Sequence, residues 1–400
     1  MTTETSSNTT NVLVAGGGVA ALEAVLALRV QAGERVAMTM LAPDEHFVYQ
    51  ALSVGEPFAL GHAKRYPLAE AAERIGLDLH AGALASVDPA ARAARTSDGA
   101  ELHYDALLLA LGAGREPAFD HALTFRGQED GEVARGLVQD VEGGYVRRIA
   151  FVVPPGHAWS LPLYELALMT AARAREMSVD GVEITVVTPE ESPLAVFGAQ
   201  ASAEVGRMLS DAGIRVEAGA HATIERKGEV LLRPGDRRLE CDRVVALPRI
   251  VGRPVQGVPA DEDGFIAIDE HARVLGVERI WAAGDGTAFP VKQGGIACQQ
   301  ADAAAADIAR VAGADVEAEP FRPVLRGQLL TGSSPRFMRH SLEGGHGDDS
   351  EVSPETLWWP PSKIAGVHLA PFLGELPEAG LEREPEVPLD LSRADVRISI

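Results

Sequence analysis

Short apolar runs alternate along most of the chain with longer, alanine-rich stretches of mixed polarity. From Asn11 to Ala42 the order is an apolar run, a glycine cluster, an alanine-rich stretch, a turn at Gly33 and a second apolar run. Continuous apolar runs are typical of strands buried on both faces, and a strand, a helix and a strand within about thirty residues form a βαβ unit. The chain therefore begins with a parallel sheet.

The same cycle returns with "IAFVVPPG" near Ile149, a helical stretch from Pro162 to Met177 and a strand from Val182. Between the two cycles lie short strands, a turn at Asp98 and Gly99, and a buried strand that we expect to rejoin the first sheet. After the second cycle, "DGFIAIDEHARVLGVERIWAAGDGTAF" and an alanine-rich helix return to the first domain. In the last eighty residues periodicity weakens while Pro, Gly, Trp and His increase.

These patterns predict an α/β fold with two Rossmann-like, doubly wound dinucleotide-binding domains, the first discontinuous, and a small C-terminal α+β domain. The expected bounds are 1–10 for a disordered tail, 11–146 with 250–316 for the first domain, 147–249 for the second, and 317–400 for a capping or interface domain.

Composition narrows the class of function. A formal net charge of −22 and a pI near 4.9 disfavour nucleic acid as a partner. No stretch approaches the roughly 20 uncharged apolar residues of a spanning helix, and the polar N-terminus lacks the pattern of a secretory signal. Cys241 and Cys298 are the two cysteines of the chain, so a disulfide framework and a four-cysteine metal site are excluded. We expect a cytoplasmic protein without a structural metal, and we interpret His340, His346, Asp348 and Asp349 as part of a solvated loop.

A nucleotide fingerprint follows the first strand. The pattern G-x-G-x-x-A is filled by Gly16, Gly18 and Ala21, between a strand and a helix. Gly16 permits a tight turn, Gly18 lets the backbone approach a pyrophosphate, and Ala21 allows close helix packing. The pyrophosphate would lie at the N-terminus of the helix.

Three motifs in order, "VLVAGGGVAALEA", "YDALLLALGA" from Tyr104 and "IWAAGDGTAF", resemble those of the pyridine nucleotide-disulfide oxidoreductase superfamily of FAD proteins. The resemblance implies that Asp285, after Gly284, hydrogen-bonds the ribityl chain of FAD. It also implies that Ala110, Gly112 and Ala113 pass beside the cofactor and that Leu84 lies at the adenine. Where the family commonly has an acid for the ribose, this chain has Ala42, and Asp44 is the candidate substitute; the alternative for Asp44 is a solvated turn.

The branch of the superfamily is indicated by what the second domain lacks. No cysteine has a neighbour in C-x-x-C or C-x4-C spacing, which excludes disulfide reduction. The second strand exit, "VVPPGHAWSLPLYELALM", retains Gly156 alone, and its prolines and Trp159 would obstruct NAD. This segment resembles sulfide:quinone oxidoreductases and flavocytochrome sulfide dehydrogenases through Tyr164 and Glu165, without their redox cysteine. "VKQGGIACQQA" supports the same branch and, less closely, type II NADH dehydrogenases.

Several side chains are candidates for the chemistry. Lys292, with the helix N-terminus at Gly295 and Ile296, would stabilise the negative charge of a reduced flavin; the alternative is a solvated surface lysine. Glu165 is the acid/base candidate, and a helix-end glutamate is its alternative. In the first turn of a helix Cys298 would be favoured as thiolate, although packing is the preferred interpretation and Cys241 is expected to be inert core. His46 would lie at the flavin edge or serve as a cap.

The sequence thus predicts an FAD-dependent oxidoreductase that passes electrons from an unidentified small donor to a small acceptor such as a quinone. One alternative is an NAD(P)H-dependent reductase of the type II NADH dehydrogenase kind, and another is a non-enzymatic flavin-binding redox sensor or electron carrier. The C-terminal "TLWWPPSKIAGVHLAPFLGEL", interrupted at Pro371, would cover the flavin, form a homodimer interface or, as the less favoured use, contact a membrane peripherally.

Overall fold

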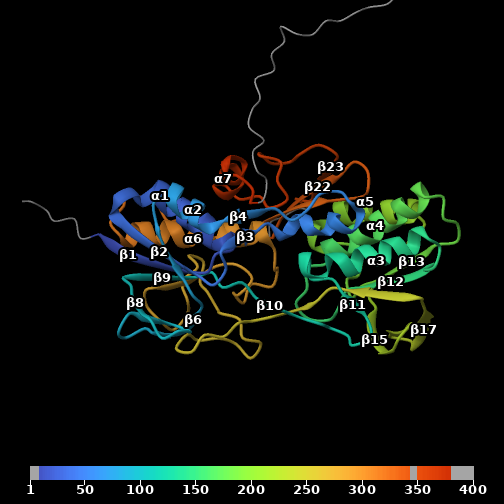
Figure 1. Ribbon diagram of the computed structural model, residues 1–400, viewed down its shortest axis with the longest axis horizontal. Helices are drawn as coiled ribbons and strands as arrows, with labels where there is room; N and C mark the ends of the chain where they lie inside the picture. Colours follow the sequence, from blue (N-terminus) through green and yellow to red (C-terminus); the bar gives the residue numbers. More distant parts are fainter. Residues whose placement is uncertain (1–8, 343–348, 380–400) are drawn as a thin grey trace, which may run out of the picture.

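The computed structural model describes residues 9–342 and 349–379. Its first sheet has the strand order β20-β9-β1-β2-β5, and every pairing in it is parallel. The strands are β1 (Thr10–Ala15), β2 (Val36–Ala42), β5 (Asp78–Ala81), β9 (Ala106–Leu109) and β20 (Ile280–Ala282). The edge strand β20 comes from far along the chain, so the polypeptide returns to this sheet after building the second one (Figure 1).

Two long helices cover one face of the first sheet. They are α1 (Val19–Ala32) and α6 (Gly294–Val311), and they share one hydrophobic cluster with Val12, Val14 and Leu108 of the strands. Their contact surfaces are rich in alanine, which allows two helices to approach closely. The other face is covered by an antiparallel sheet of β6 (Leu84–Asp88), β7 (Ala93–Thr96) and β8 (Glu101–His103).

The second sheet repeats this architecture with the order β11-β18-β12-β13-β14, again parallel throughout. Its strands are β11 (Leu123–Thr124), β12 (Arg148–Val152), β13 (Glu183–Val187), β14 (Arg215–Glu217) and β18 (Arg243–Ala246). The helices of this half are η3 (Gln128–Asp130), α3 (Gly131–Glu142), α4 (Leu161–Glu176), η4 (Ala195–Phe197) and α5 (Gly198–Asp211). The three α-helices pack on one face of the sheet. An antiparallel sheet of β15 (His221–Arg226), β16 (Glu229–Arg233) and β17 (Arg237–Glu240) packs against its other face.

Two linkers join the halves and pair with each other as β10 (Gly114–Glu116) and β19 (Arg249–Val251), in the middle of Figure 1. A Cβ at Gly114 would stand 2.7 Å from Val251, so the close pairing requires glycine there. Shorter elements complete the first half: η1 (Gly33–Arg35), β3 (His46–Val48), η2 (Gln50–Phe58), β4 (Arg65–Pro67) and α2 (Leu68–Ile75).

The C-terminal part forms an antiparallel sheet of β21 (Val324–Leu329), β22 (Arg336–Ser341) and β23 (Glu351–Ser353), followed by α7 (Leu369–Glu375). The sheet packs on the second half through Leu325, Leu329 and Met338. Helix α7 instead joins the cluster of α1 and α6, through Leu369 and Leu373. The C-terminal part therefore reaches across both halves (Figure 1).

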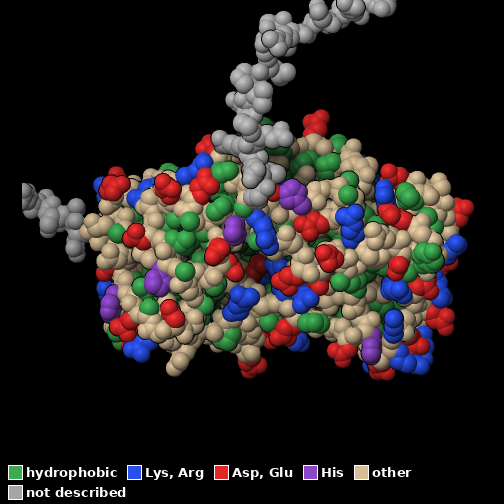
Figure 2. Space-filling model, viewed as in Figure 1, with side chains coloured by type: hydrophobic (Ala, Val, Ile, Leu, Met, Phe, Trp, Pro, Cys, Tyr) green, Lys and Arg blue, Asp and Glu red, His purple; other side chains and the backbone are tan. Residues whose placement is uncertain are grey.

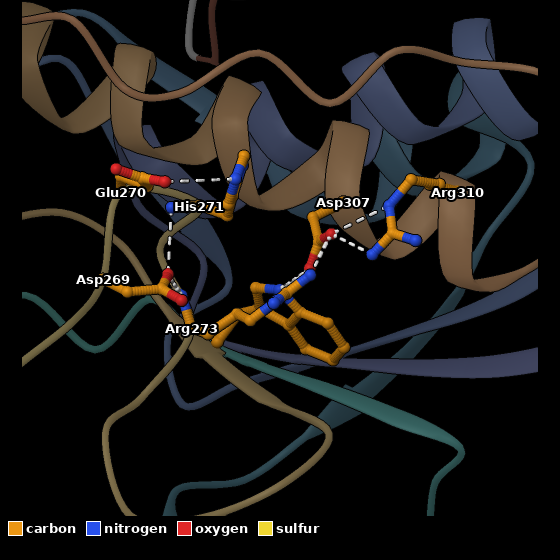
Figure 3. Close-up of polar contacts among 7 residues, drawn as sticks. Asp269, Glu270, His271, Arg273, Asp307 and Arg310 are labelled. Atoms are coloured by element: carbon orange, nitrogen blue, oxygen red, sulfur yellow. Dashed lines mark hydrogen bonds and ion pairs between the residues drawn. The ribbon is translucent and has the colours of Figure 1, made fainter.

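A cluster of charged side chains around the buried Asp307 ties α6 to the first sheet. The carboxylate of Asp307 accepts hydrogen bonds from Arg273 (2.6 Å to each oxygen), from Arg310 and from the indole of Trp281 in β20 (Figure 3). These donors hold the pKa of Asp307 at about 2 against the opposing effect of its burial, the largest single influence. The cluster fixes α6 relative to β20.

The predicted fold class is confirmed: both parallel sheets are Rossmann-like and an α+β part follows them. Three local expectations are corrected. Pro371 does not interrupt a helix, because it falls in the first turn of α7, where its missing N–H would have no intrahelical partner. The helix expected after Gly295 begins at Gly294. The residues proposed as a solvated loop lie partly outside the described chain, and His340 belongs to β22. The domain bounds stay a prediction.

Within residues 9–342 and 349–379, none of the helices combines the length and the apolar character that crossing a bilayer demands. The same residues contain no group of three or more His, Cys, Asp or Glu side chains arranged to hold a metal ion.

Candidate functional site

A cavity of about 990 Å³ lies where four parallel strands of the first sheet end. Its wall includes the segments that follow β1, β2, β9 and β20, and it continues to the second half and to the C-terminal part. In open parallel sheets ligands bind outside the carboxyl ends of the strands. The cavity therefore has the place, and the size, of a dinucleotide site.

The turn between β1 and α1 is built for an anion. Gly16 has φ 128°, and a Cβ on it would lie 2.1 Å from the carbonyl oxygen of Ala110, so no other residue fits. Gly18 precedes the first turn of α1 without a side-chain cap, and a Cβ on it would meet nothing within 4 Å of the protein. Its open side faces the space in which a ligand would lie, and the first amides of α1 are free to bind it. Ala21 is fully buried in the helix packing.

The other predicted cofactor residues lie around the same cavity with three exceptions. Asp44, Leu84, Ala110, Gly112, Gly284, Asp285 and Lys292 all border it. Asp44 is exposed at the end of β2. Ala113, Gly295 and Ile296 are not among the residues that form its wall. The N–H of Ile296 donates to the side chain of Gln293 at 2.9 Å, and Gly294 and Ala297, its neighbours in α6, border the cavity.

An acid and a base lie together at the β20 end of the cavity. The pKa of Asp285 is raised by burial, which Arg115 and Lys292 oppose. Lys292 is 4% exposed, which excludes the solvated-surface alternative, and burial lowers its pKa to about 8. Its ammonium donates to the carbonyl oxygen of Thr287 at 2.5 Å and stands 3.7 Å above the ring of Phe265. The structure thus places a positive charge in a part of the cavity wall that is almost inaccessible to water.

Cys298 corrects a sequence expectation. It is fully buried in the α1–α6 interface and does not border the cavity. Burial, together with Glu23 and Asp302, raises its pKa well above the ordinary value, so the thiolate expected from the helix dipole is disfavoured. Cys241 is likewise buried, and its pKa is raised to about 11, chiefly by burial. Burial thus favours the protonated thiol at both cysteines.

Of a buried ion pair between Glu165 and Lys363, the sequence analysis singled out Glu165 alone. Glu165 is 0% exposed, and one of its carboxylate oxygens accepts from the ammonium of Lys363 at 2.5 Å and from the amide of Leu330 at 2.8 Å. Lys363 borders the cavity, whereas Glu165 lies behind it. Burial raises the pKa of Glu165 and lowers that of Lys363, against the attraction between them. A lysine inside the apolar "WWPPSKIAGV" was the one available signal for this pair.

In the second half, Glu190, the first acid after β13, is already hydrogen-bonded to side chains of the protein. Glu190 accepts from Tyr164 (2.8 Å), Thr188 (3.0 Å) and Ser160 (3.2 Å), and its pKa is raised by burial. The indole of Trp159 packs against Phe197 with ring centroids 5.8 Å apart. Glu190 thus has three hydroxyl donors within the protein, while the next acid, Glu191, is exposed.

The second half contributes an apolar wall to the cavity. Its residues there are Trp159, Leu161, Pro162, Leu247, Pro248 and Ile250. His46, from β3, also borders the cavity. On the face shown in Figure 2, Lys and Arg side chains alternate with Asp and Glu side chains rather than forming one basic area.

Comparison with known proteins agrees with this geometry. The sequence model of a family described as pyridine nucleotide-disulphide oxidoreductase matches residues 165–307. An NADH dehydrogenase-like protein of Mycobacterium tuberculosis is 28% identical over 234 residues, 56% of this chain and 58% of that protein. The chain thus spans less than two thirds of the length of that relative. The ferredoxin–NAD(+) reductase component of the biphenyl dioxygenase system of Paraburkholderia xenovorans is 27% identical over 308 residues, 71% of this chain and 69% of that protein.

Two solved structures show the same fold. The sulfide:quinone oxidoreductase of Aquifex aeolicus superposes with a TM-score of 0.76 at 16% identity, over 86% of this chain and 87% of that one. A ferredoxin reductase from Rhodopseudomonas palustris gives a TM-score of 0.62 at 22% identity, over 84% and 83%.

Proposed function

We propose that this chain, which matches the pyridine nucleotide-disulphide oxidoreductase family model over residues 165–307, is a flavin-dependent oxidoreductase that binds FAD and passes electrons from a small donor to a small acceptor such as a quinone. The observation that carries this proposal is the cavity with an anion-binding glycine turn at one end and the Asp285–Lys292 pair at the other. Bound FAD would supply two-electron redox chemistry at its isoalloxazine ring.

The residues present fit that cofactor. The glycine turn at Gly16 and Gly18 would hold the diphosphate. Asp285, whose carboxylate has no hydrogen-bond partner among the described residues, would accept from the hydroxyls of the ribityl chain. Asp44 and Leu84 would contact the ribose and the adenine, and the segment from Ala110 would pass beside the flavin. Gly284 would permit the close approach of the backbone.

Lys292 and Lys363 would do different work at the reacting end. The charge of Lys292, held over Phe265, would stabilise the negative charge that a flavin gains on reduction. Lys363 would hold a proton at its ammonium beside the reacting groups, with Glu165 behind it as the compensating base. Glu165 therefore acts on the cavity through Lys363 and not directly.

The second half supports a donor other than NADH. The acid after β13 is engaged by three hydroxyls, and the strand exit lacks the glycines of a nucleotide fingerprint. Its apolar wall at Trp159 and Pro162 suits a ring such as a quinone. The names of the relatives favour a second candidate, an NAD(P)H-dependent reductase acting on a quinone or on a ferredoxin-like protein.

The decisive experiment is spectroscopic. The purified chain should be yellow, release FAD on denaturation and, under anaerobic conditions, bleach slowly or not at all with NADH and NADPH but rapidly with its donor. A panel of thiols, sulfide, hydroquinones and organic acids would be screened for that bleaching. Rapid bleaching by NADH would favour the second candidate. A colourless protein that fails to take up FAD would overturn the proposal, and stable FAD without turnover would favour a sensor or carrier.

A further inference from the structure

A buried carboxylate on the first helix has no role in the cavity. Glu23 of α1 is 0% exposed, does not border the cavity, and has no Lys or Arg as an ion-pair partner among the residues that the structure describes. A buried carboxyl group needs hydrogen-bond partners, so those partners identify what it is for. Asp302 and Cys298 of α6 also lie against Glu23.

Both oxygens of Glu23 bind backbone of the C-terminal part. One accepts from the amide of His368 at 2.9 Å and the other from the amide of Leu369 at 2.6 Å. A carboxylate accepts on both oxygens, whereas a glutamine would present an NH2 group to one of these donors. The sequence separation of more than 340 residues makes this a tertiary clasp.

The residues held by this clasp form a segment that we call the C-terminal strap, residues 362–369. Its other end is held twice more: the hydroxyl of Tyr49 accepts from the amide of Ile364 at 2.7 Å, and the ammonium of Lys363 pairs with Glu165. The strap therefore has one anchor on α1, one on the turn before η2 and one on α4. These anchors come from both halves of the molecule.

The strap is fitted closely to the start of α6. A Cβ on Gly366 would lie 2.6 Å from the carboxylate of Glu23 and 3.0 Å from the sulfur of Cys298. A Cβ on Gly294 would lie 2.9 Å from Ile364. Because the strap has Gly366 and the start of α6 has Gly294, the strap packs directly against the N-terminal end of α6. Lys363 and Ile364 thereby become part of the cavity wall.

We propose that Glu23, with Tyr49 as a second anchor, is a positioning residue that docks the C-terminal strap and so places Lys363 in the wall of the reaction cavity. The inference rests on the proposed function for the role of Lys363, but the docking itself does not. Glu23 acts from outside the cavity, because it does not border the cavity itself, whereas Lys363 and Ile364 of the strap do.

Trypsin provides the first test, since Lys363 is a cleavage site that docking protects. In the full-length protein, cleavage after Lys363 would be followed by mass spectrometry and compared with cleavage after Lys227, in the exposed turn between β15 and β16. Glu23→Gln and Tyr49→Phe should each speed cleavage after Lys363 by roughly tenfold, since losing a hydrogen bond of this kind changes an equilibrium by about that factor. Glu34→Gln, at an exposed acid just beyond α1, is the matched control and should change neither rate.

Equal cleavage after Lys363 in the wild type and in both variants would overturn the proposal. So would an equal acceleration after Lys227, because Glu23 would then support the whole fold and not the strap. If Glu23→Gln fails to fold, Tyr49→Phe alone decides, since it removes one hydroxyl and keeps the ring.

Turnover provides the second test. The pH profile of kcat in Glu23→Gln should change in the same direction as that of Lys363→Met, while KM and FAD content change less. A kcat profile that stays at the wild-type shape while the strap is cleaved faster would overturn the positioning role. A wild-type protein without FAD or turnover would overturn the proposed function alone, because the proteolysis result would still report the docking.

Discussion

At the scale of single residues, burial decides the chemistry here more than sequence neighbourhood does. Cys298 and Lys292 lie close together in the sequence, yet one is a protonated thiol packed between helices and the other a base in a cavity wall. Burial disfavours the charged form of both. Lys292 keeps two neighbouring carboxylates, Asp285 and Asp261, which favour its charge, whereas the acids around Cys298 repel a thiolate.

The pKa of about 8 makes a prediction for Lys292. Its positive charge is present below that pH and lost above it, so its stabilisation of a reduced flavin should fade as the pH rises through about 8. Lys292→Met should lower the reduction potential of the flavin and slow turnover by about tenfold to hundredfold at pH 7. Dye-coupled potentials from pH 6.5 to 9.5 should show the two proteins converging at the alkaline end. A difference in reduction potential that stays constant across this pH range would contradict the prediction. Lys227→Met, at an exposed position, is the control.

At the scale of elements, two structural junctions carry the site: the turn from β1 into α1 and the attachment of α6 to β20. The first was predictable because the two glycines stand at fixed positions between an apolar run and an alanine-rich one. The second was not, since Arg273, Trp281 and Asp307 are far apart in the sequence and no local pattern pairs them.

Alanine substitutions at Gly16 and Gly18 should separate effects on folding from effects on FAD binding. Gly16→Ala should reduce both stability and FAD content, because its φ is positive and its Cβ would collide with Ala110. Gly18→Ala should leave the melting temperature of the apoprotein within the ordinary range of a surface substitution, since its Cβ meets no protein atom. It should nevertheless lose FAD affinity by about tenfold or more, because that Cβ would enter the space of the diphosphate. Unchanged FAD content in Gly18→Ala would argue against the diphosphate lying there.

The attachment of α6 makes a prediction about stability and pH. Because the folded-state pKa of Asp307 is about 2, below its unfolded value of 3.8, its contribution is present above pH 4 and is lost as the pH falls from about 4 to 2. Asp307→Asn should cost about 2 kcal/mol of unfolding free energy at pH 7. Urea unfolding followed by tryptophan fluorescence in a pH series would measure it. Asp236→Asn, in an exposed pair, should change little; an equal loss in both variants would contradict the role of burial.

At the scale of the whole molecule, the cavity is assembled from every part of the chain. The first sheet provides one end of it, the second half an apolar wall, and the C-terminal part Gln328, Lys363 and Ile364. A ligand that fills it should therefore add contacts between parts that already touch through the two linker strands, through Val54 and Phe58 of η2 and through the C-terminal part. The homodimer interface and the peripheral membrane contact considered for the C-terminal part stay predictions.

Cofactor removal should accordingly destabilise the molecule. At a free FAD concentration of about one hundred times Kd, linkage adds about 2.7 kcal/mol to the unfolding free energy. Thermal melts of the apoprotein with and without FAD should show a rise of several degrees that depends on concentration. Riboflavin, which lacks the diphosphate held by the glycine turn, should give a much smaller rise. Equal melting temperatures with and without FAD would contradict the assignment of the cavity.

The sequence by itself determined the two parallel sheets and the glycine turn, because each depends on residues close together in the chain and on a period or spacing that backbone geometry imposes. The role expected of Asp285 came instead from the resemblance of its motif to a known family. Tertiary structure alone decided that Lys363 borders the cavity, that Glu23 clasps the strap, that Glu190 is hydrogen-bonded within the protein and that burial opposes a thiolate at Cys298. Those outcomes depend on contacts between distant segments and on burial, and neither is written in any local pattern. Hydrogen-bond partners and desolvation exist only once the chain has closed on itself.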